Sequence, residues 1–202
     1  MSIKAIISDY GGVLVKMVDE TARFILAEQA GLPLKEIYRL VFESESASQA
    51  ALGEITNDQH WENVRAAMRL PPAQLPGFIT KFWSVDGLNT VFVNYLRSER
   101  SRYHIGLLSN AADDLRGMLI NRWKIADMFD DMIISAEVHL VKPDGRIYHL
   151  ACSRLNVHPD EAVFIDDMPE NVEGARAAGL SAIQYRTNEQ VFADLDQILK
   201  QG

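Results

Sequence analysis

Short apolar runs alternate along the chain with longer segments in which apolar residues recur every three or four positions. The short runs are rich in β-branched residues and predict five strands, at residues 3–8, 103–109, 132–135, 162–166 and 181–185. The longer segments predict helices, one of which is expected to start at Pro169 and to close at Gly179. Strands that alternate with helices are typical of a parallel sheet covered by helices. The pattern therefore predicts an α/β fold with about five parallel strands.

One long segment, residues 16–85, does not show this alternation. It carries helical patterns at residues 21–30, 34–42, 58–68 and 74–83, separated by breaks rich in Gly and Pro. No convincing strand pattern is found within it, and Asp86-Gly87 marks its end. We interpret this segment as a helical insert after the first strand. Residues 1–15 and 86–202 would then form the catalytic core.

Composition and charge narrow the classes of protein to consider. The chain has 202 residues, 48% of them hydrophobic, which is enough for one well-buried core and a small second lobe. Cys152 is the only cysteine, so no disulfide forms within the chain and we expect a cytoplasmic location. We expect neither a signal peptide nor a membrane span, because no apolar run approaches ~18 residues. A net charge of −8 disfavours binding to nucleic acid or to anionic membranes.

Polar side chains follow the ends of several predicted strands. They are Asp9, Ser109 with Asn110, Lys142, and Asp166 with Asp167. In an open parallel sheet the carboxyl ends of the strands form the ligand crevice, so we expect these groups to lie close together. Carboxylates, a hydroxyl, an amide and an ammonium in one place are suited to bind Mg²⁺ and a phosphate group.

Each signal taken alone has a simpler explanation. Asp9 could end a strand at a turn, Ser109 or Asn110 could cap the next helix, and Asp167 could cap the helix that starts at Pro169. Turn and cap chemistry does not require Lys142 among these groups, however. Because all of them occur in order along one edge of one predicted sheet, we favour a catalytic site.

The same residues resemble the four motifs of the haloacid dehalogenase-like hydrolase superfamily, and the resemblance spans essentially the whole chain. The matching positions are residues 9–14, 107–110 and 141–143 for the first three motifs, and residues 164–167 with Asn171 for the fourth. The resemblance implies a Rossmann-like core with a helical cap inserted after the first motif. It also implies Mg²⁺-dependent hydrolysis through an aspartyl-phosphate.

Two further stretches, residues 142–148 and 53–56, resemble one branch of this superfamily. That branch holds sugar-phosphate phosphatases and the amino-terminal phosphatase domain of soluble epoxide hydrolases. The resemblance implies a small phosphorylated substrate, and we expect a monomer or a weak homodimer. Which phosphate ester is hydrolysed stays open, since a sugar, a nucleotide, a lipid or a small acid could carry the phosphate.

In this interpretation Asp9 is the nucleophile. Mg²⁺ is expected to bind one oxygen of Asp9, the backbone carbonyl of Gly11 and the carboxylate of Asp167. Asp166 is expected to belong to the metal site by orienting a water molecule, with Asn171 behind it.

Three residues are expected to bind the phosphate group itself. Ser109 and the backbone amide of Asn110 would donate hydrogen bonds to its oxygens, while Lys142 offsets the charge of the phosphate and Asp9.

Gly11 departs from the usual first motif, which has a second Asp at this position as general acid and base. A positioned acid or base contributes ~10² to 10⁴-fold, so its absence should slow catalysis rather than abolish it. Some phosphatases of the resembled branch also have Gly there. His139, three residues before Lys142, is a candidate replacement, although an exposed loop histidine is the simpler interpretation.

Two other functions compete with a phosphatase. A haloacid dehalogenase would use the same Asp9 and Lys142 but needs no metal, so Asp166 and Asp167 would have no role. A non-catalytic phosphate-binding protein would bury Asp9, Lys142 and Asp167 at a cost that neither chemistry nor metal binding offsets. A phosphomutase is disfavoured further, because it depends on the missing second Asp.

Overall fold

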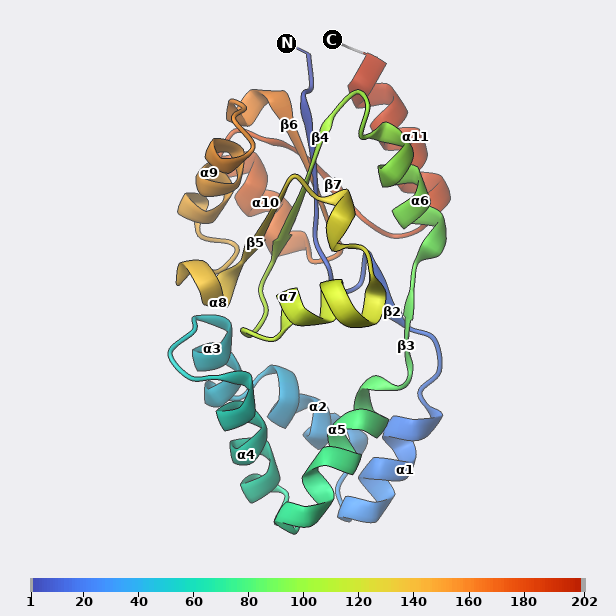
Figure 1. The fold of residues 1–202 in the computed structure, drawn as a ribbon, viewed down its shortest axis with the longest axis vertical. Coiled ribbons are helices and arrows are strands. Elements are labelled where there is room, and N and C mark those ends of the chain that lie inside the picture. Colours follow the sequence, from blue (N-terminus) through green and yellow to red (C-terminus); the bar gives the residue numbers. More distant parts are fainter. Residues whose placement is uncertain (1, 201–202) are drawn as a thin grey trace.

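The computed structural model describes residues 2–200 and contains a five-stranded sheet whose neighbouring strands are all parallel. The strand order is β5-β4-β1-β6-β7, which places β1 at the centre (Figure 1). In that order the strands are β5 (Asp131–Ile134), β4 (His104–Ser109), β1 (Ala5–Ser8), β6 (Ala162–Asp166) and β7 (Ser181–Gln184). The predicted Rossmann-like α/β fold is confirmed, and each predicted strand is present with small shifts at its ends.

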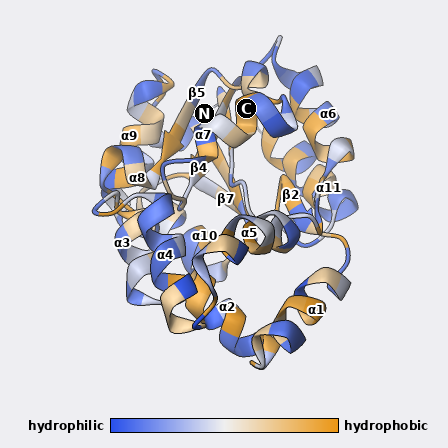
Figure 2. Ribbon diagram, turned by 60° about the horizontal axis from the view of Figure 1, so that its bottom comes forward, coloured by the Kyte–Doolittle hydropathy of each residue, from blue (hydrophilic) through white to orange (hydrophobic). Residues whose placement is uncertain are grey.

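A hydrophobic core lies on each face of the sheet, because alternate side chains of a strand point to opposite faces. Ile6 of β1 packs in one core and its neighbour Ile7 packs in the other. The covering helices are amphipathic, with hydrophobic and hydrophilic sides (Figure 2). They are α6 (Thr90–Glu99) and α11 (Asn188–Lys200) over the first core, and α9 (Gly145–Arg154) and α10 (Pro169–Ala177) over the second.

Several short helical segments connect these elements. They are α7 (Leu115–Met118), η2 (Leu119–Trp123), η3 (Ala126–Met128), α8 (Ser135–Val138) and η4 (Pro159–Glu161). Within residues 2–200, no helix is both long enough and apolar enough to cross a membrane.

Five helices form a separate layer at the end of the molecule toward which the central strands run, and we call them the cap helices (Figure 1). They are α1 (Thr21–Ala30), α2 (Leu34–Phe42), α3 (Glu45–Ala51), α4 (Asn57–Ala67) and α5 (Leu75–Trp83), with a short turn, η1 (Pro72–Gln74), before the last. The cap helices have a hydrophobic core of their own, which includes Trp61, Phe78 and Phe82.

Two features of this region differ from the sequence prediction. The helix α3 was not expected, because it is rich in Ser and Ala and buries only Ala50. The prediction that residues 16–85 contain no strand is wrong at its start, since β2 (Val15–Met17) pairs antiparallel with β3 (Asp86–Leu88). Each of these strands has three residues, too few for an alternating pattern to show. This ribbon joins the cap helices to the sheet, and the boundaries of the two expected domains stay a prediction.

Four hydrogen bonds join the core to the cap helices and the loops between them, which together we call the cap region, and on the cap side each of these four uses a backbone atom. They join Ser135 Oγ to Ala51 O (2.6 Å), His139 Nδ1 to Leu52 O (2.7 Å), Arg122 Nη2 to Trp83 O (2.6 Å) and Asn57 N to Asp113 Oδ1 (2.9 Å). The core therefore supplies the side chains, and the cap region supplies three carbonyl groups and one amide.

Arg23 connects the cap helices to the ribbon from a buried position in α1. Its Nη2 lies 2.8 Å from Asp86 Oδ1 in β3, and its Nε donates to the carbonyl of Phe82 at 3.1 Å. The guanidinium also lies 4.2 Å from the centroid of the Phe82 ring. Burial raises the pKa of Asp86, and the positive charge of Arg23 opposes part of this rise. The ionised form of Asp86 is therefore stabilised by Arg23.

Replacing Arg23 by Met is expected to lower the free energy of unfolding by about 3 kcal/mol, because Asp86 is left in a poorly hydrated place without its cation. Urea unfolding followed by tryptophan fluorescence measures the change. The double variant Arg23→Met with Asp86→Asn is expected to recover part of the loss, since it also removes the unpaired charge. A double variant no more stable than Arg23→Met would show that the charge is not the cause.

Candidate active site

Three adjacent strands end at the candidate site, and each positions one polar side chain there. Asp9 directly follows β1, Ser109 ends β4 and Asp166 ends β6. Because β1 lies between β4 and β6, the sheet order places the three residues side by side. All three are buried. The structure therefore brings these predicted site residues together.

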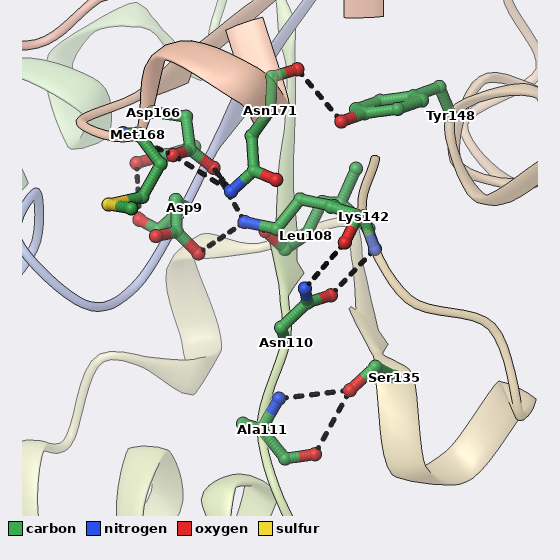
Figure 3. A network of polar contacts seen from close by, with 11 residues as sticks. Asp9, Leu108, Asn110, Ala111, Ser135, Lys142, Tyr148, Asp166, Met168 and Asn171 are labelled. Carbon is green, nitrogen blue, oxygen red and sulfur yellow. Dashed lines mark hydrogen bonds and ion pairs between the residues drawn. The ribbon is translucent and has the colours of Figure 1, made fainter. Parts of the chain in front are cut away.

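The ammonium group of Lys142 lies between two of these carboxylates (Figure 3). Its Nζ donates to Asp9 Oδ1 at 2.8 Å, to Asp166 Oδ2 at 2.6 Å and to the carbonyl of Leu108 at 3.1 Å. The three N–H donors of the ammonium are thereby directed at groups from all three central strands. The lysine side chain is only 1% exposed, so this position is almost completely removed from water.

Asn110 fixes the backbone of Lys142 from the end of β4. Its side-chain amide donates to the carbonyl of Lys142 at 2.9 Å and accepts from the Lys142 amide at 2.8 Å (Figure 3). This paired contact was not foreseen from the sequence, which gives no sign that residues 110 and 142 meet. Because the side chain is occupied in this way, the backbone amide is the group of Asn110 that can serve a phosphate.

The charges of the site depend strongly on one another. Burial alone would lower the pKa of Lys142, but attraction to Asp9 and Asp166 outweighs it and raises that pKa, so the ammonium stays charged. Burial raises the pKa of Asp9 to about 6, and Lys142 opposes this rise. The ionised form of Asp9 therefore relies on positive charge beside it.

Asp166 is fully engaged by hydrogen bonds. Besides Lys142, the side-chain amide of Asn171 lies 3.1 Å from each of its carboxylate oxygens, and the backbone amide of Met168 donates to Oδ1 at 2.8 Å. The side-chain amide of Asn171 thus contacts the Asp166 carboxylate directly, as Figure 3 shows. With both oxygens occupied, Asp166 is suited to hold Lys142 in place. Asp9 and Asp167 remain as the carboxylates that can bind a metal directly.

The donor set fits a divalent cation. One oxygen of each of Asp9, Asp166 and Asp167 lies within 4.8 Å of the others. Lys142 compensates only part of this negative charge, and partial burial together with Asp166 raises the pKa of Asp167. Crowded carboxylate oxygens with excess negative charge are the ligands that Mg²⁺ prefers.

His139 contacts the cap region. The residue is exposed, and its Nδ1–H donates to the carbonyl of Leu52 at 2.7 Å. This bond occupies one ring nitrogen of His139, and its role as the replacement acid stays a hypothesis.

A pocket of about 470 Å³ opens beside the candidate metal site, between the core and the cap helices. Among its lining residues are Gly11 and Asp167 of the candidate metal site, together with Lys16, Arg23, Phe42, Trp83, Asp86, Tyr185 and Arg186. The sequence alone does not identify Lys16, Phe42, Trp83, Tyr185 or Arg186 as pocket residues. Their positions in sequence carry no shared motif, because the pocket is formed by folding of distant segments.

Comparison with known proteins places this geometry in a family. The family model described as haloacid dehalogenase-like hydrolase matches residues 3–179. The chain belongs to this family of hydrolases. A family enzyme from Bacteroides thetaiotaomicron, in complex with magnesium and inorganic phosphate, has a similar fold with a TM-score of 0.79 and 22% identity. The alignment covers 95% of this chain and 100% of that one.

Curated relatives of the hydrolase include both phosphatases and dehalogenases. Bifunctional epoxide hydrolase 2 of Sus scrofa is 26% identical over 98% of this chain and 39% of its own length. Validoxylamine A 7'-phosphate phosphatase of Streptomyces hygroscopicus subsp. limoneus is 24% identical over 87% of this chain and 82% of its own. (S)-2-haloacid dehalogenase 4A of Burkholderia cepacia is 31% identical over 44% and 37%. This chain spans less than half of the epoxide hydrolase.

Substitution of Gly12 tests the position of Asp167 within this hydrolase site. A Cβ on Gly12 would lie 2.2 Å from Asp167 Oδ2, and its φ of +72° disfavours any other residue. We expect Gly12→Ala to cost about 1–3 kcal/mol of stability and to weaken Mg²⁺ binding, because the carboxylate must move. Thermal unfolding and calorimetric titration with Mg²⁺ measure the two effects.

Gly11→Ala is the matched control, since its Cβ would meet no atom within 4 Å. The control should keep the stability of the wild-type protein. Equal behaviour of the two variants would contradict the close approach of Asp167 to Gly12.

Proposed function

We propose that this hydrolase is a Mg²⁺-dependent phosphatase that cleaves a small phosphate monoester through an aspartyl-phosphate on Asp9. The supporting observation is that Asp9, Asp166 and Asp167 lie together and that the buried ammonium group of Lys142 is paired with the first two. This set provides a nucleophile, a fixed positive charge and carboxylate oxygens for a metal in one place. Phosphoryl transfer needs these elements, because it is accelerated mainly by positioning and by neutralisation of the phosphate oxygens.

Asp9 performs the covalent step in this mechanism. Its free carboxylate oxygen attacks phosphorus while the bond to the ester oxygen breaks, and the ester oxygen leaves with that bonding pair and takes a proton from water. A water molecule then attacks the phosphorus of the aspartyl-phosphate, the bond between phosphorus and the Asp9 oxygen breaks, inorganic phosphate is released, and the proton of the attacking water passes to solvent. Lys142 holds the other oxygen of Asp9 and so fixes the direction of attack.

The remaining residues bind the phosphate group and offset its charge. The Ser109 hydroxyl and the Asn110 backbone amide donate hydrogen bonds to the phosphate oxygens, and the charged Lys142 stabilises their negative charge. When bound by Asp9, the Gly11 carbonyl and Asp167, Mg²⁺ supplies further positive charge at the transferring phosphoryl group. We also propose that the protein is cytoplasmic and acts as a monomer or a weak homodimer.

A dehalogenase is the second candidate, because the same Asp9 and Lys142 could displace halide from a carbon atom and a dehalogenase is among the relatives. That reaction needs no metal. The placement of Asp167 against Gly12 and next to Asp9 favours the phosphatase, since a half-buried, repelled carboxylate is explained by a cation.

The proposed reaction is tested by phosphate release from a panel of phosphate monoesters in Mg²⁺, with and without a chelator. We expect hydrolysis only with Mg²⁺. Asp9→Asn should lower turnover on the order of 10³-fold or more while the protein stays folded, because the nucleophile is removed from an unchanged shape. The exposed Asp160 lies outside the site, so Asp160→Asn is the control and should keep full activity.

Two results would overturn this proposal. Undiminished hydrolysis in chelator, or near-normal turnover by Asp9→Asn, contradicts the mechanism. Halide release from a 2-haloacid without Mg²⁺ would instead identify a dehalogenase.

The presence of Gly11 predicts that the rate of hydrolysis depends strongly on the acidity of the leaving alcohol. Without an acid beside the ester oxygen, phosphates of acidic alcohols should react much faster than simple alkyl phosphates. The same missing base should make the aspartyl-phosphate long-lived, so an activated aryl phosphate should give a burst of alcohol. A series of aryl phosphates graded in leaving-group pKa, followed by stopped flow, measures both effects.

The variant Gly11→Asp is expected to flatten this dependence, by up to about 10²-fold for the poorest leaving groups. The site has room for the new side chain, because a Cβ at Gly11 meets no atom within 4 Å. Gly11→Asn has the same size but cannot transfer the proton, and should leave the dependence steep. A flat dependence without a burst in the wild-type protein would contradict the prediction, and His139→Ala on the same series would show whether that histidine supplies the proton.

A further inference from the structure

The pocket beside the candidate metal site is lined by charged and by aromatic side chains. Lys16 of β2 contributes to it with Tyr185 and Arg186, and the cap helices contribute Arg23, Phe42 and Trp83. Its volume of about 470 Å³ is in the range of sites for small organic ligands. Because Asp167, which lies next to Asp9, lines the pocket together with Gly11, a phosphate ester bound at Asp9 would place its alcohol part in this pocket.

The ammonium group of Lys16 is held by an aromatic ring rather than by a carboxylate. Its Nζ lies 4.0 Å from the centroid of the Tyr185 ring. Tyr185 is only 4% exposed, and its hydroxyl donates to Asn188 Oδ1 at 2.6 Å, so the ring is a fixed platform. A cation–π contact positions a cation without neutralising it. The positive charge of Lys16 is therefore oriented and still available to a ligand.

Arg186 adds a second positive charge directly after Tyr185. Among residues 2–200, neither Lys16 nor Arg186 lies within 4.0 Å of a carboxylate oxygen, the limit for an ion pair. The third cation of the pocket, Arg23, is by contrast paired with Asp86 at 2.8 Å. Two cations without an ion pair in one pocket stand out in a chain with a net charge of −8.

Two aromatic side chains of the cap helices, Phe42 and Trp83, also line the pocket. Phe42 is 49% exposed, which is unusual for a large hydrophobic side chain, and its ring lies 5.9 Å from that of Trp83 at an angle of 71°. Such rings offer contact area to a planar or apolar part of a ligand.

We propose that the alcohol part of the substrate carries a second anionic group, which Lys16 and Arg186 recognise while Phe42 and Trp83 contact its apolar portion. This inference rests on the proposed phosphate-ester site and adds the substrate class. A carboxylate or a second phosphate would supply the same chemistry, since both present anionic oxygens to an ammonium and a guanidinium.

Binding of non-hydrolysable probes tests the inference without depending on turnover. The probes are benzylphosphonates that carry a para-carboxylate, a para-phosphonate or the neutral para-carboxamide, titrated calorimetrically into the wild-type protein with Mg²⁺. We expect both anionic probes to bind about tenfold more tightly than the carboxamide, because each gains charge-assisted hydrogen bonds. The tighter of the two identifies which anionic group is preferred.

Variants separate recognition from a general electrostatic effect. Lys16→Met should reduce the preference for the anionic probes to about threefold or less, and Arg186→Gln should reduce it as well. Lys35→Met changes the net charge by the same amount from an exposed position in α2 outside the pocket, and should leave the preference unchanged.

Three results would overturn the inference. They are equal affinity of the wild-type protein for the charged and neutral probes, failure of all three probes to bind, and equal weakening of all probes by Lys16→Met. The last result would mean that Lys16 only offsets the charge of Asp167. Failure of the phosphatase proposal is distinguishable, because it would appear as absent phosphate release while the preference among the probes persists.

Discussion

The site depends on one buried ammonium group shared by two carboxylates. Lys142 contacts Asp9 after β1, Asp166 at the end of β6 and the carbonyl of Leu108 in β4. A charge this far from water is tolerated only when its hydrogen bonds are satisfied by opposite charges. Because β4, β1 and β6 are adjacent in the sheet, their ends supply all three hydrogen-bond partners of the ammonium group. The order of the strands therefore determines whether the buried charge is stabilised.

The two ends of the site differ in rigidity and in charge. Around Lys142, the contacts of Asn110 and Asn171 saturate the polar groups, and among residues 2–200 no buried side-chain nitrogen or oxygen lacks a hydrogen-bond partner. The pocket beside Asp167 has two cations, Lys16 and Arg186, that form no ion pair among residues 2–200, and an exposed aromatic ring, Phe42. A fixed reacting centre next to an open recognition region suits an enzyme whose chemistry is constant and whose substrate is chosen elsewhere.

The sequence predicts the features that depend on local patterns. The strands β1 and β6 are recognisable because both of their faces are buried, which gives continuous apolar runs, and the polar residues that follow them mark the sheet edge. The helix α3 is not predicted because it buries a single alanine and so shows no apolar pattern. The ribbon of β2 and β3 is not predicted because its two strands are far apart in the sequence. The paired hydrogen bonds between Asn110 and the backbone of Lys142 likewise depend on tertiary structure alone.

The hydrogen bonds between core and cap region have a consequence for how such a protein can diverge. Ala51, Leu52 and Trp83 accept through their carbonyl groups, and Asn57 donates through its amide. Backbone groups are present whatever side chain occupies a position. Amino-acid exchanges at these four cap positions can therefore accumulate without loss of these hydrogen bonds to the core, provided that the helices persist, whereas Arg23 contacts Asp86 through its side chain. New substrate preferences can evolve in this layer while the catalytic architecture is inherited intact.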